Sequence, residues 1–288
     1  MECVYCDYWK RSYEDELVFE EILEILDDAA EAGIGVYTVT GGEPLLRDDL
    51  SEILEEADDR GFYTVLVTNG LLLGKHDLEP DMLSISLDTL NKKKYKEITG
   101  RNKLEKVKKS IQEASSTYSN VVINTVIHED NYNEISDLVK FANKWDVGIN
   151  FEPVSSYFEG CPKIEPQKLK KAAEELINLK KEYGCVKNSD QYLKLIKNQE
   201  SFDCLSYLLL RLNPNGEVIS PCYELNQSKK TENAKKTNIN KIINKKLYKE
   251  GIKLAKNCER NCYLSCYAEP SLFTKKPTKF IKEIKYLK

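Results

Sequence analysis

Met1-Glu2-Cys3-Val4-Tyr5-Cys6 and, after an apolar run, Gly41-Gly42-Glu43-Pro44 are the two stretches that decide the fold of this chain. The first places two thiols three positions apart, with an aromatic residue directly before the second. Thiolates at this spacing on a loop can bind neighbouring irons of one cluster. In the second stretch, the glycines let a ligand approach the backbone closely, and the Glu43 carboxylate can accept hydrogen bonds from an ammonium group.

Outward from these stretches, apolar strands alternate with amphipathic helices up to about residue 155. Such alternation predicts parallel β/α units with right-handed crossovers. In a β/α barrel the chemistry sits at the carboxyl ends of the strands, so the turns at 41–43, 68–70 and 86–88 are expected on one rim. The expected strands are 36–40, 63–67, 82–87, 121–127 and 148–154.

These motifs resemble those of the radical S-adenosylmethionine (SAM) superfamily. Its members carry C-x3-C-x2-C with an aromatic residue before the last cysteine, followed by a strand that ends in G-G-E-P. The resemblance implies the α/β fold class, with a partial (βα)6 TIM-like barrel. The first cysteine of the pattern would precede Met1, so the chain as given is expected to lack the first barrel strand and one cluster ligand.

The resemblance also implies roles for individual residues. Cys3 and Cys6 would bind a [4Fe-4S] cluster, Tyr5 would lie against the adenine of SAM, and residues 41–43 would receive the methionine ammonium group. Reductive cleavage of SAM would then yield a 5′-deoxyadenosyl radical that abstracts a hydrogen atom from the substrate.

Further SAM contacts are expected from the next two turns and from one strand. Hydroxyls and a carboxylate there can bond the ribose and the methionine carboxylate. Ordinary turn and capping roles stay open for the same residue types. The expected SAM contacts are Thr68, Asn69, Ser86, Asp88 and the strand residue Asn124.

Beyond residue 200 the alternation stops and the sequence becomes rich in cysteine. The turn 213–216, Asn-Pro-Asn-Gly, predicts a hairpin. The pattern is similar to the SPASM or twitch extension of peptide- and cofactor-maturing radical SAM enzymes, which implies one auxiliary [4Fe-4S] cluster. A zinc site of four thiolates and buried thiols without metal stay open as alternatives. The candidate ligands are Cys204, Cys222, Cys258, Cys262 and Cys266.

Two domains are expected, a core barrel over 1–185 and an auxiliary iron–sulfur domain over 186–288. The expected function is radical chemistry on a peptide, protein or cofactor precursor, with a ferredoxin or flavodoxin as the electron donor. One alternative is GTP cyclisation for molybdopterin precursor synthesis, because 68–73 and 86–90 resemble that branch of the family. Another is a non-catalytic iron–sulfur or zinc-binding protein.

The amino-acid composition limits which other classes of protein this chain could belong to. The chain has 288 residues, of which 41% are hydrophobic, and no apolar run long enough to span a membrane. Nine cysteines, several of them in tight clusters, favour metal ligation in a reducing cytoplasm over a disulfide framework. The family resemblance implies an oxidoreductase or maturase type of enzyme.

Charge is uneven along the chain: residues 1–60 carry 19 acidic and four basic side chains, and residues 225–288 carry 17 basic and five acidic ones. These surfaces are expected to attract each other, with nucleic acid an unlikely partner.

Ordinary structural roles are expected for two histidines and two lone cysteines: His76, His128, Cys161 and Cys185. His128 could also face the cavity, because it follows a strand.

Overall fold

A computed structural model describes residues 1–75, 77–155, 163–220, 222, 225, 232–260 and 262–275. In this part of the chain a five-stranded sheet has the order β1-β2-β3-β4-β5, and every neighbouring pair is parallel. The predicted α/β class and all five predicted strands are confirmed. The strands are β1 (Val36–Val39), β2 (Tyr63–Thr68), β3 (Met82–Ser86), β4 (Val121–Ile127) and β5 (Gly148–Pro153).

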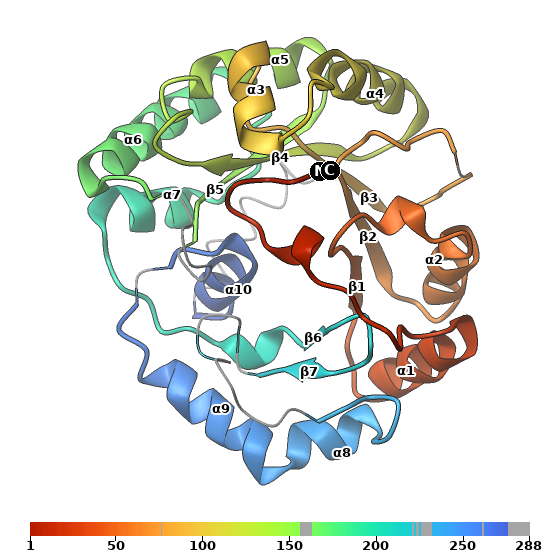
Figure 1. The fold of residues 1–288 in the computed structure, drawn as a ribbon. Helices are drawn as coiled ribbons and strands as arrows, with labels where there is room; N and C mark the ends of the chain where they lie inside the picture. The colour runs from red at the N-terminus through yellow and green to blue at the C-terminus, as the bar shows by residue number, and fades with distance from the viewer. Residues whose placement is uncertain are drawn as a thin grey trace.

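Helices lie on the outer side of this curved sheet, as in a partial barrel (Figure 1). Each buries one apolar stripe; that of α2, for example, contains Leu50, Ile53, Leu54 and Ala57, the face expected from the sequence. The helices are α1 (Phe19–Glu31), α2 (Leu50–Asp59), α3 (Lys92–Thr99), α4 (Leu104–Thr117), α5 (Ile135–Lys144), α6 (Pro166–Tyr183) and α7 (Asp190–Asn198).

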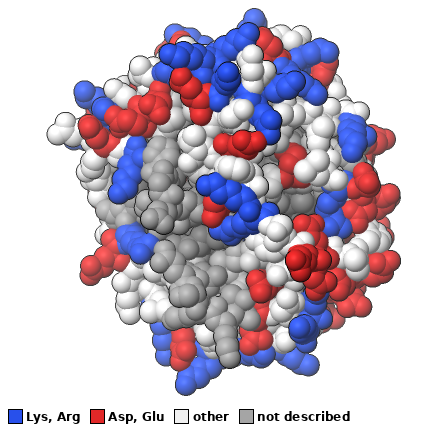
Figure 2. Space-filling view, viewed as in Figure 1, with Lys and Arg blue, Asp and Glu red and all other residues white. Residues whose placement is uncertain are grey.

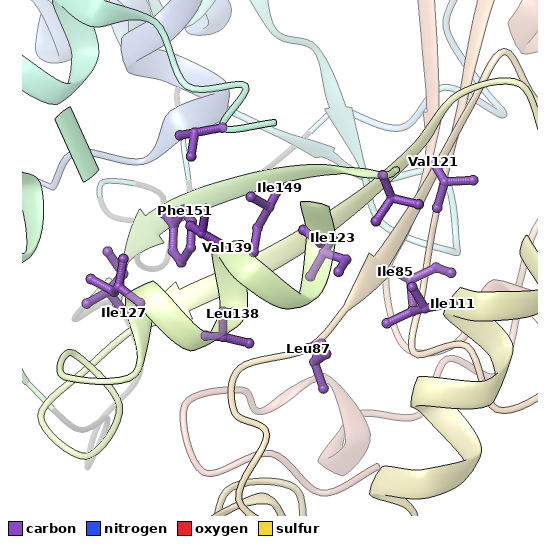
Figure 3. Close-up of a cluster of buried hydrophobic side chains, with 14 of the residues drawn as sticks. Ile85, Leu87, Ile111, Val121, Ile123, Ile127, Leu138, Val139, Ile149 and Phe151 are labelled. Atoms are coloured by element: carbon purple, nitrogen blue, oxygen red, sulfur yellow. The ribbon is translucent and has the colours of Figure 1, made fainter. Parts of the chain in front are cut away.

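The main core lies between the sheet and these helices (Figure 3). Ile123 on β4 and Ile149 and Phe151 on β5 have no exposed surface, and Leu138 and Val139 of α5 cover them. Strands buried on both faces read as continuous apolar runs, which is why the strands were visible in the sequence.

The free edge of β5 is closed by residues 185–188. The Ile149 N–H donates to the Cys185 carbonyl at 2.9 Å, and the Lys187 N–H donates to the Ile149 carbonyl at 2.9 Å. The Asn188 amide then takes the place of a strand partner, because it bonds both the N–H and the carbonyl of Phe151, at 2.8 and 2.9 Å.

The cysteine-rich region begins with the predicted hairpin, in which β6 (Arg211–Leu212) pairs antiparallel with β7 (Val218–Ile219). Three helices follow, and Figure 1 shows α8 and α9 outside the hairpin and α10 inside the ring of elements. They are α8 (Ile239–Asn244), α9 (Lys246–Lys256) and α10 (Ser265–Lys275).

The acidic and basic ends of the chain meet as expected. Lys235 pairs with Asp15 and Glu21, each at 3.1 Å, and the N–H of Ile239 at the start of α8 donates to Asp28 of α1 at 3.1 Å. Figure 2 shows acidic side chains gathered on the side of the molecule where α1 and α2 lie. Among the described residues, no helix combines the length and the apolarity needed to cross a membrane.

Candidate active site

The thiol-bearing loop is fastened to the end of α3. The N–H groups of Glu2 and Val4 donate to the carbonyls of Thr99 and Ile98, both at 2.9 Å. Gly100, with φ +69°, ends α3 beneath Glu2, where a Cβ would lie 3.2 Å from the Glu2 side chain. The end of α3 therefore sets where residues 1–6 cross the rim.

Tyr5 joins this loop to the carboxyl ends of β3 and β4. Its hydroxyl donates to Asp88 Oδ2, while Asp88 Oδ1 accepts from the Val126 N–H at 2.8 Å. Burial raises the pKa of Asp88 to about 6, although the Tyr5 bond opposes that shift. In this structure Asp88 therefore positions Tyr5, and its direct contact with SAM stays a prediction.

Cys3 and Cys6 lie on one turn, in which the Cys6 N–H donates to the Cys3 carbonyl at 3.1 Å. Burial, with smaller effects of Asp88 and Cys6, raises the pKa of Cys3 to about 12, and burial also raises that of Cys6. Both are therefore neutral thiols in the protein alone. A bound metal deprotonates coordinating thiols, so the pair fits two ligands of an iron–sulfur cluster.

The Glu43 carboxylate forms hydrogen bonds with the turn after β2. Glu43 Oε1 accepts from the Thr68 hydroxyl at 2.6 Å, and Oε2 accepts from the Asn69 N–H at 3.0 Å. Gly41 has φ +126°, which suits glycine alone, and a Cβ at Gly42 would meet nothing within 4 Å. The backbone of this turn is therefore open to a ligand while its carboxylate is held in place.

Ser86 and Asn124 are register partners on the adjacent strands β3 and β4, and both are half-buried. Ser86 and the turns after β1, β2 and β3 lie at the carboxyl ends of the strands, whereas Asn124 lies in the middle of β4. The thiol loop crosses the same rim through Tyr5 and Asp88. The thiol loop and the Glu43 turn therefore lie on the same rim, as the sequence led us to expect.

A second group of cysteines lines one pocket. Its walls include Cys204, Cys222, Cys258 and Cys262, with apolar side chains such as Leu264 between them. Burial, followed by the neighbouring thiols, raises the pKa of Cys204 to about 12. Four thiols around one pocket fit the ligands of a cluster.

Cys266, the fifth candidate, does not line that pocket. Its sulfur accepts a hydrogen bond from Arg211 Nη2 at 2.8 Å, and burial raises its pKa to about 11. Across the described ranges, no three His, Cys, Asp or Glu side chains converge closely enough to hold a single metal ion.

Two further polar residues lie at the rim, of which the sequence analysis missed Glu152 and favoured an ordinary role for His128. Glu152, at the end of β5, accepts from the Ser265 hydroxyl at 2.7 Å and so ties the barrel to α10. His128, given an ordinary role from the sequence, is fully buried beside Tyr5, with 6.0 Å between the ring centroids. A polar residue inside an apolar strand, the signal used for Asn124, could have found Glu152, and the place of His128 just after a strand was the reason to expect that it could face the cavity. His76 and Cys161 lie outside the described residues.

The burial of Asp88 predicts a pH dependence of stability. Because its pKa is raised from 3.8 to about 6, the folded protein keeps this proton at pH values where the unfolded chain has lost it. The free energy of unfolding should therefore fall by about 2–3 kcal/mol as the pH rises from about 4 to above 6.

Asp88→Asn cannot ionise, so the comparison of the two proteins isolates this effect. Urea denaturation between pH 4 and 7 is expected to show the unaltered protein losing that amount relative to the variant. A difference in unfolding free energy that does not change with pH would contradict burial as the cause.

Comparisons with known proteins agree with this geometry. Residues 1–142 match the family model described as the radical SAM superfamily, and residues 158–286 match a domain of unknown function, DUF3463. The GTP 3′,8-cyclase of Clostridium perfringens (strain SM101 / Type A) is 33% identical over 172 residues, which cover 56% of this chain and 53% of that protein. The chain thus spans about half the length of that curated relative.

A probable GTP 3′,8-cyclase of Archaeoglobus fulgidus is 27% identical over 250 residues, covering 79% of this chain and 83% of that protein. Streptococcus suis SuiB, in a crystal structure bound to S-adenosylmethionine, superposes with a TM-score of 0.71 at 19% identity, over 88% of this chain and 64% of SuiB. That likeness shows the shared fold. The match over residues 1–142 identifies this part of the chain as a radical SAM domain.

Proposed function

We propose that the protein is an enzyme that binds a [4Fe-4S] cluster and SAM at the rim of its barrel and starts radical chemistry on a precursor molecule. The observation that carries this proposal is the meeting of the Tyr5–Asp88 contact and the Glu43–Thr68 contact on one rim. When bound, such a cluster supplies the electron for reductive cleavage of SAM.

The residues of the chain supply binding and orientation. Cys3 and Cys6 would hold the cluster, and the Glu43 carboxylate, fixed by Thr68, would accept hydrogen bonds from the SAM ammonium group. The open backbone at Gly42 supports a close approach of that ligand. Tyr5, anchored by Asp88, would orient the adenine.

An auxiliary [4Fe-4S] cluster is proposed at the cysteine pocket, with Cys204, Cys222, Cys258 and Cys262 as its ligands. All four line the same space. A zinc ion bonds each sulfur at ~2.3 Å and so needs the sulfurs in mutual contact, whereas the described side chains include no such convergence. Four thiolates that each bind a different iron stand farther apart, which favours the cluster.

A peptide is the substrate class that we propose first. SuiB, whose fold this chain shares over 88% of its length, has also been crystallised bound to its precursor peptide SuiA. GTP is the second candidate substrate, because the curated relatives are GTP 3′,8-cyclases. Thiolate ligation of iron needs reduced cysteines, so we propose a reducing compartment such as the cytoplasm, with an electron donor of the ferredoxin or flavodoxin type.

Anaerobic reconstitution with iron and sulfide tests the proposal. The loaded protein is expected to hold about eight irons and to release 5′-deoxyadenosine from SAM when dithionite is added. Stoichiometric zinc with no iron, and no 5′-deoxyadenosine, would instead identify a non-catalytic metal-binding protein. Addition of GTP in the same assay separates the substrate candidates, since a cyclised nucleotide product would favour GTP over a peptide.

A further inference from the structure

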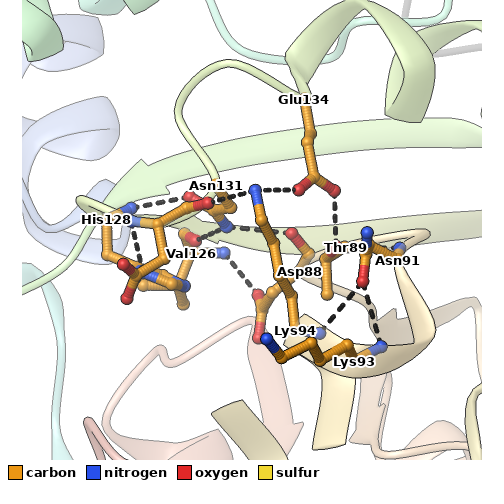
Figure 4. A network of polar contacts seen from close by, with 10 residues as sticks. Asp88, Thr89, Asn91, Lys93, Lys94, Val126, His128, Asn131 and Glu134 are labelled. Atoms are coloured by element: carbon orange, nitrogen blue, oxygen red, sulfur yellow. Dashed lines mark hydrogen bonds and ion pairs between the residues drawn. The ribbon is translucent and has the colours of Figure 1, made fainter. Parts of the chain in front are cut away.

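His128 lies directly after β4, at the rim that carries the candidate site (Figure 4). Its side chain has no exposed surface, and its ring is 6.0 Å from that of Tyr5, at an interplanar angle of 44°. The His128 N–H donates to Asn131 Oδ1 at 2.8 Å, which fixes the backbone at this position.

Two groups of Asp130 face Nδ1 of the ring. The Asp130 N–H donates to Nδ1 at 3.3 Å, closer than the Asp130 carboxylate at 3.6 Å, so we assign the lone pair to Nδ1 and the proton of the neutral imidazole to Nε2. Burial lowers the pKa of His128, which keeps the ring neutral. Nε2 is therefore a hydrogen-bond donor.

That donor has no acceptor among the described residues, although Nε2 is buried. Buried donors in native proteins are nearly always paired, so an unpaired one requires a specific cause. The neighbouring polar groups are already committed. Asn131 Nδ2 donates to the carbonyls of Asp88 and Val126, at 2.9 and 2.7 Å, and both Asp88 carboxylate oxygens accept hydrogen bonds. Among the described residues of this network, the His128 Nε2–H is thus a donor without an acceptor.

We propose that His128 is a positioning residue whose Nε2–H donates a hydrogen bond to an acceptor atom of SAM seated beside Tyr5. The inference rests on the proposed function and extends it to a residue outside the superfamily motifs found in the sequence. Ring nitrogens of the adenine and oxygens of the ribose are the acceptors that SAM presents there. Because Nε2 is buried in the protein alone, the contact requires the side chains around the ring to rearrange locally when the ligand enters.

Two amide substitutions separate the two ring nitrogens. In His128→Asn the amide oxygen can still accept from the Asp130 N–H, but no group reaches the position of Nε2. In His128→Gln the longer side chain can place an N–H donor near that position. If Nε2–H bonds the ligand, His128→Asn should therefore bind SAM weakly, and His128→Gln should restore most of the affinity.

The test is calorimetric titration of SAM into the reconstituted full chain without reductant, so that no turnover occurs. We expect Kd for SAM to rise about tenfold in His128→Asn and to stay within about threefold of the unaltered protein in His128→Gln. Thermal unfolding of each variant, followed by circular dichroism, checks that the fold is kept. Should His128→Asn fail to fold, His128→Phe replaces it as the variant without a donor.

Equal SAM affinity in the unaltered protein and in the variant without a donor would overturn the role of His128 and leave the proposed function standing. Equal weakening in the Asn and Gln variants would also overturn it, because a packing role predicts no rescue. Failure of the unaltered reconstituted protein to bind SAM would overturn the proposed function, and this inference with it.

Discussion

Replacement of both Cys3 and Cys6 by alanine is expected to remove about four irons per chain and to reduce 5′-deoxyadenosine release at least 100-fold. The two thiols share one turn, and burial holds both as neutral thiols until a metal deprotonates them. Without them the rim keeps its SAM-binding turns but lacks the iron ligands. Iron and sulfide analysis and chromatographic assay of 5′-deoxyadenosine measure the two effects.

Cys185→Ala is the matched control. Its half-buried thiol donates to the Val139 carbonyl at 3.7 Å and belongs to neither cysteine group, so iron content and SAM cleavage should stay at the unaltered level. Joint replacement of Cys258 and Cys262 should instead remove the other four irons. Full iron content after loss of Cys3 and Cys6 would show that the cluster binds elsewhere.

Glu43→Gln is expected to weaken SAM binding about 10- to 100-fold, because a carboxylate that accepts from an ammonium group contributes about 1.5–3 kcal/mol. The substitution keeps the size of the side chain but places an amide where Oε2 now accepts from the Asn69 N–H. Calorimetric titration of SAM into the reconstituted protein measures the loss.

Glu97→Gln changes a carboxylate on α3 whose only described ion pair is with Lys93, at 3.9 Å, and it should bind SAM normally. The unfolding free energy of Glu43→Gln needs its own measurement, since the turn itself should lose about 1–3 kcal/mol from the unmatched Asn69 N–H. Unchanged SAM affinity in a folded Glu43→Gln protein would remove Glu43 from the site.

The parallel sheet and its rim could be predicted from the sequence because both depend on local patterns. Strands buried on two faces are continuous apolar runs, and the turns that follow them carry glycine, asparagine and hydroxyl residues. The chain order of such units fixes which ends of the strands meet. The closeness of the Glu43 turn to the turn after β2 follows from that rule, and the bonds of Glu43 to Thr68 and Asn69 are consistent with it.

The side-chain environments could not be predicted in the same way. The raised pKa of Asp88 arises from its burial beneath Tyr5, a residue 83 positions away. The burial of His128 depends on its packing beside Tyr5, and the hydrogen bond from Arg211 to the Cys266 sulfur joins residues 55 positions apart. These are properties of tertiary packing, on which spacing in the sequence carries no information. The domain boundary at residue 185 stays a prediction.

The bond between Glu152 and Ser265 has a practical consequence for how this protein is dissected. Ser265 opens α10 only three residues after Cys262, so the last barrel strand is anchored beside the second thiol group. Tyr192 strengthens this anchor, because its buried hydroxyl donates to the Tyr263 carbonyl at 2.6 Å. A chain cut after the barrel would leave the Glu152 carboxylate and the Tyr192 hydroxyl without these partners. The two halves should therefore be expressed, purified and assayed as one chain.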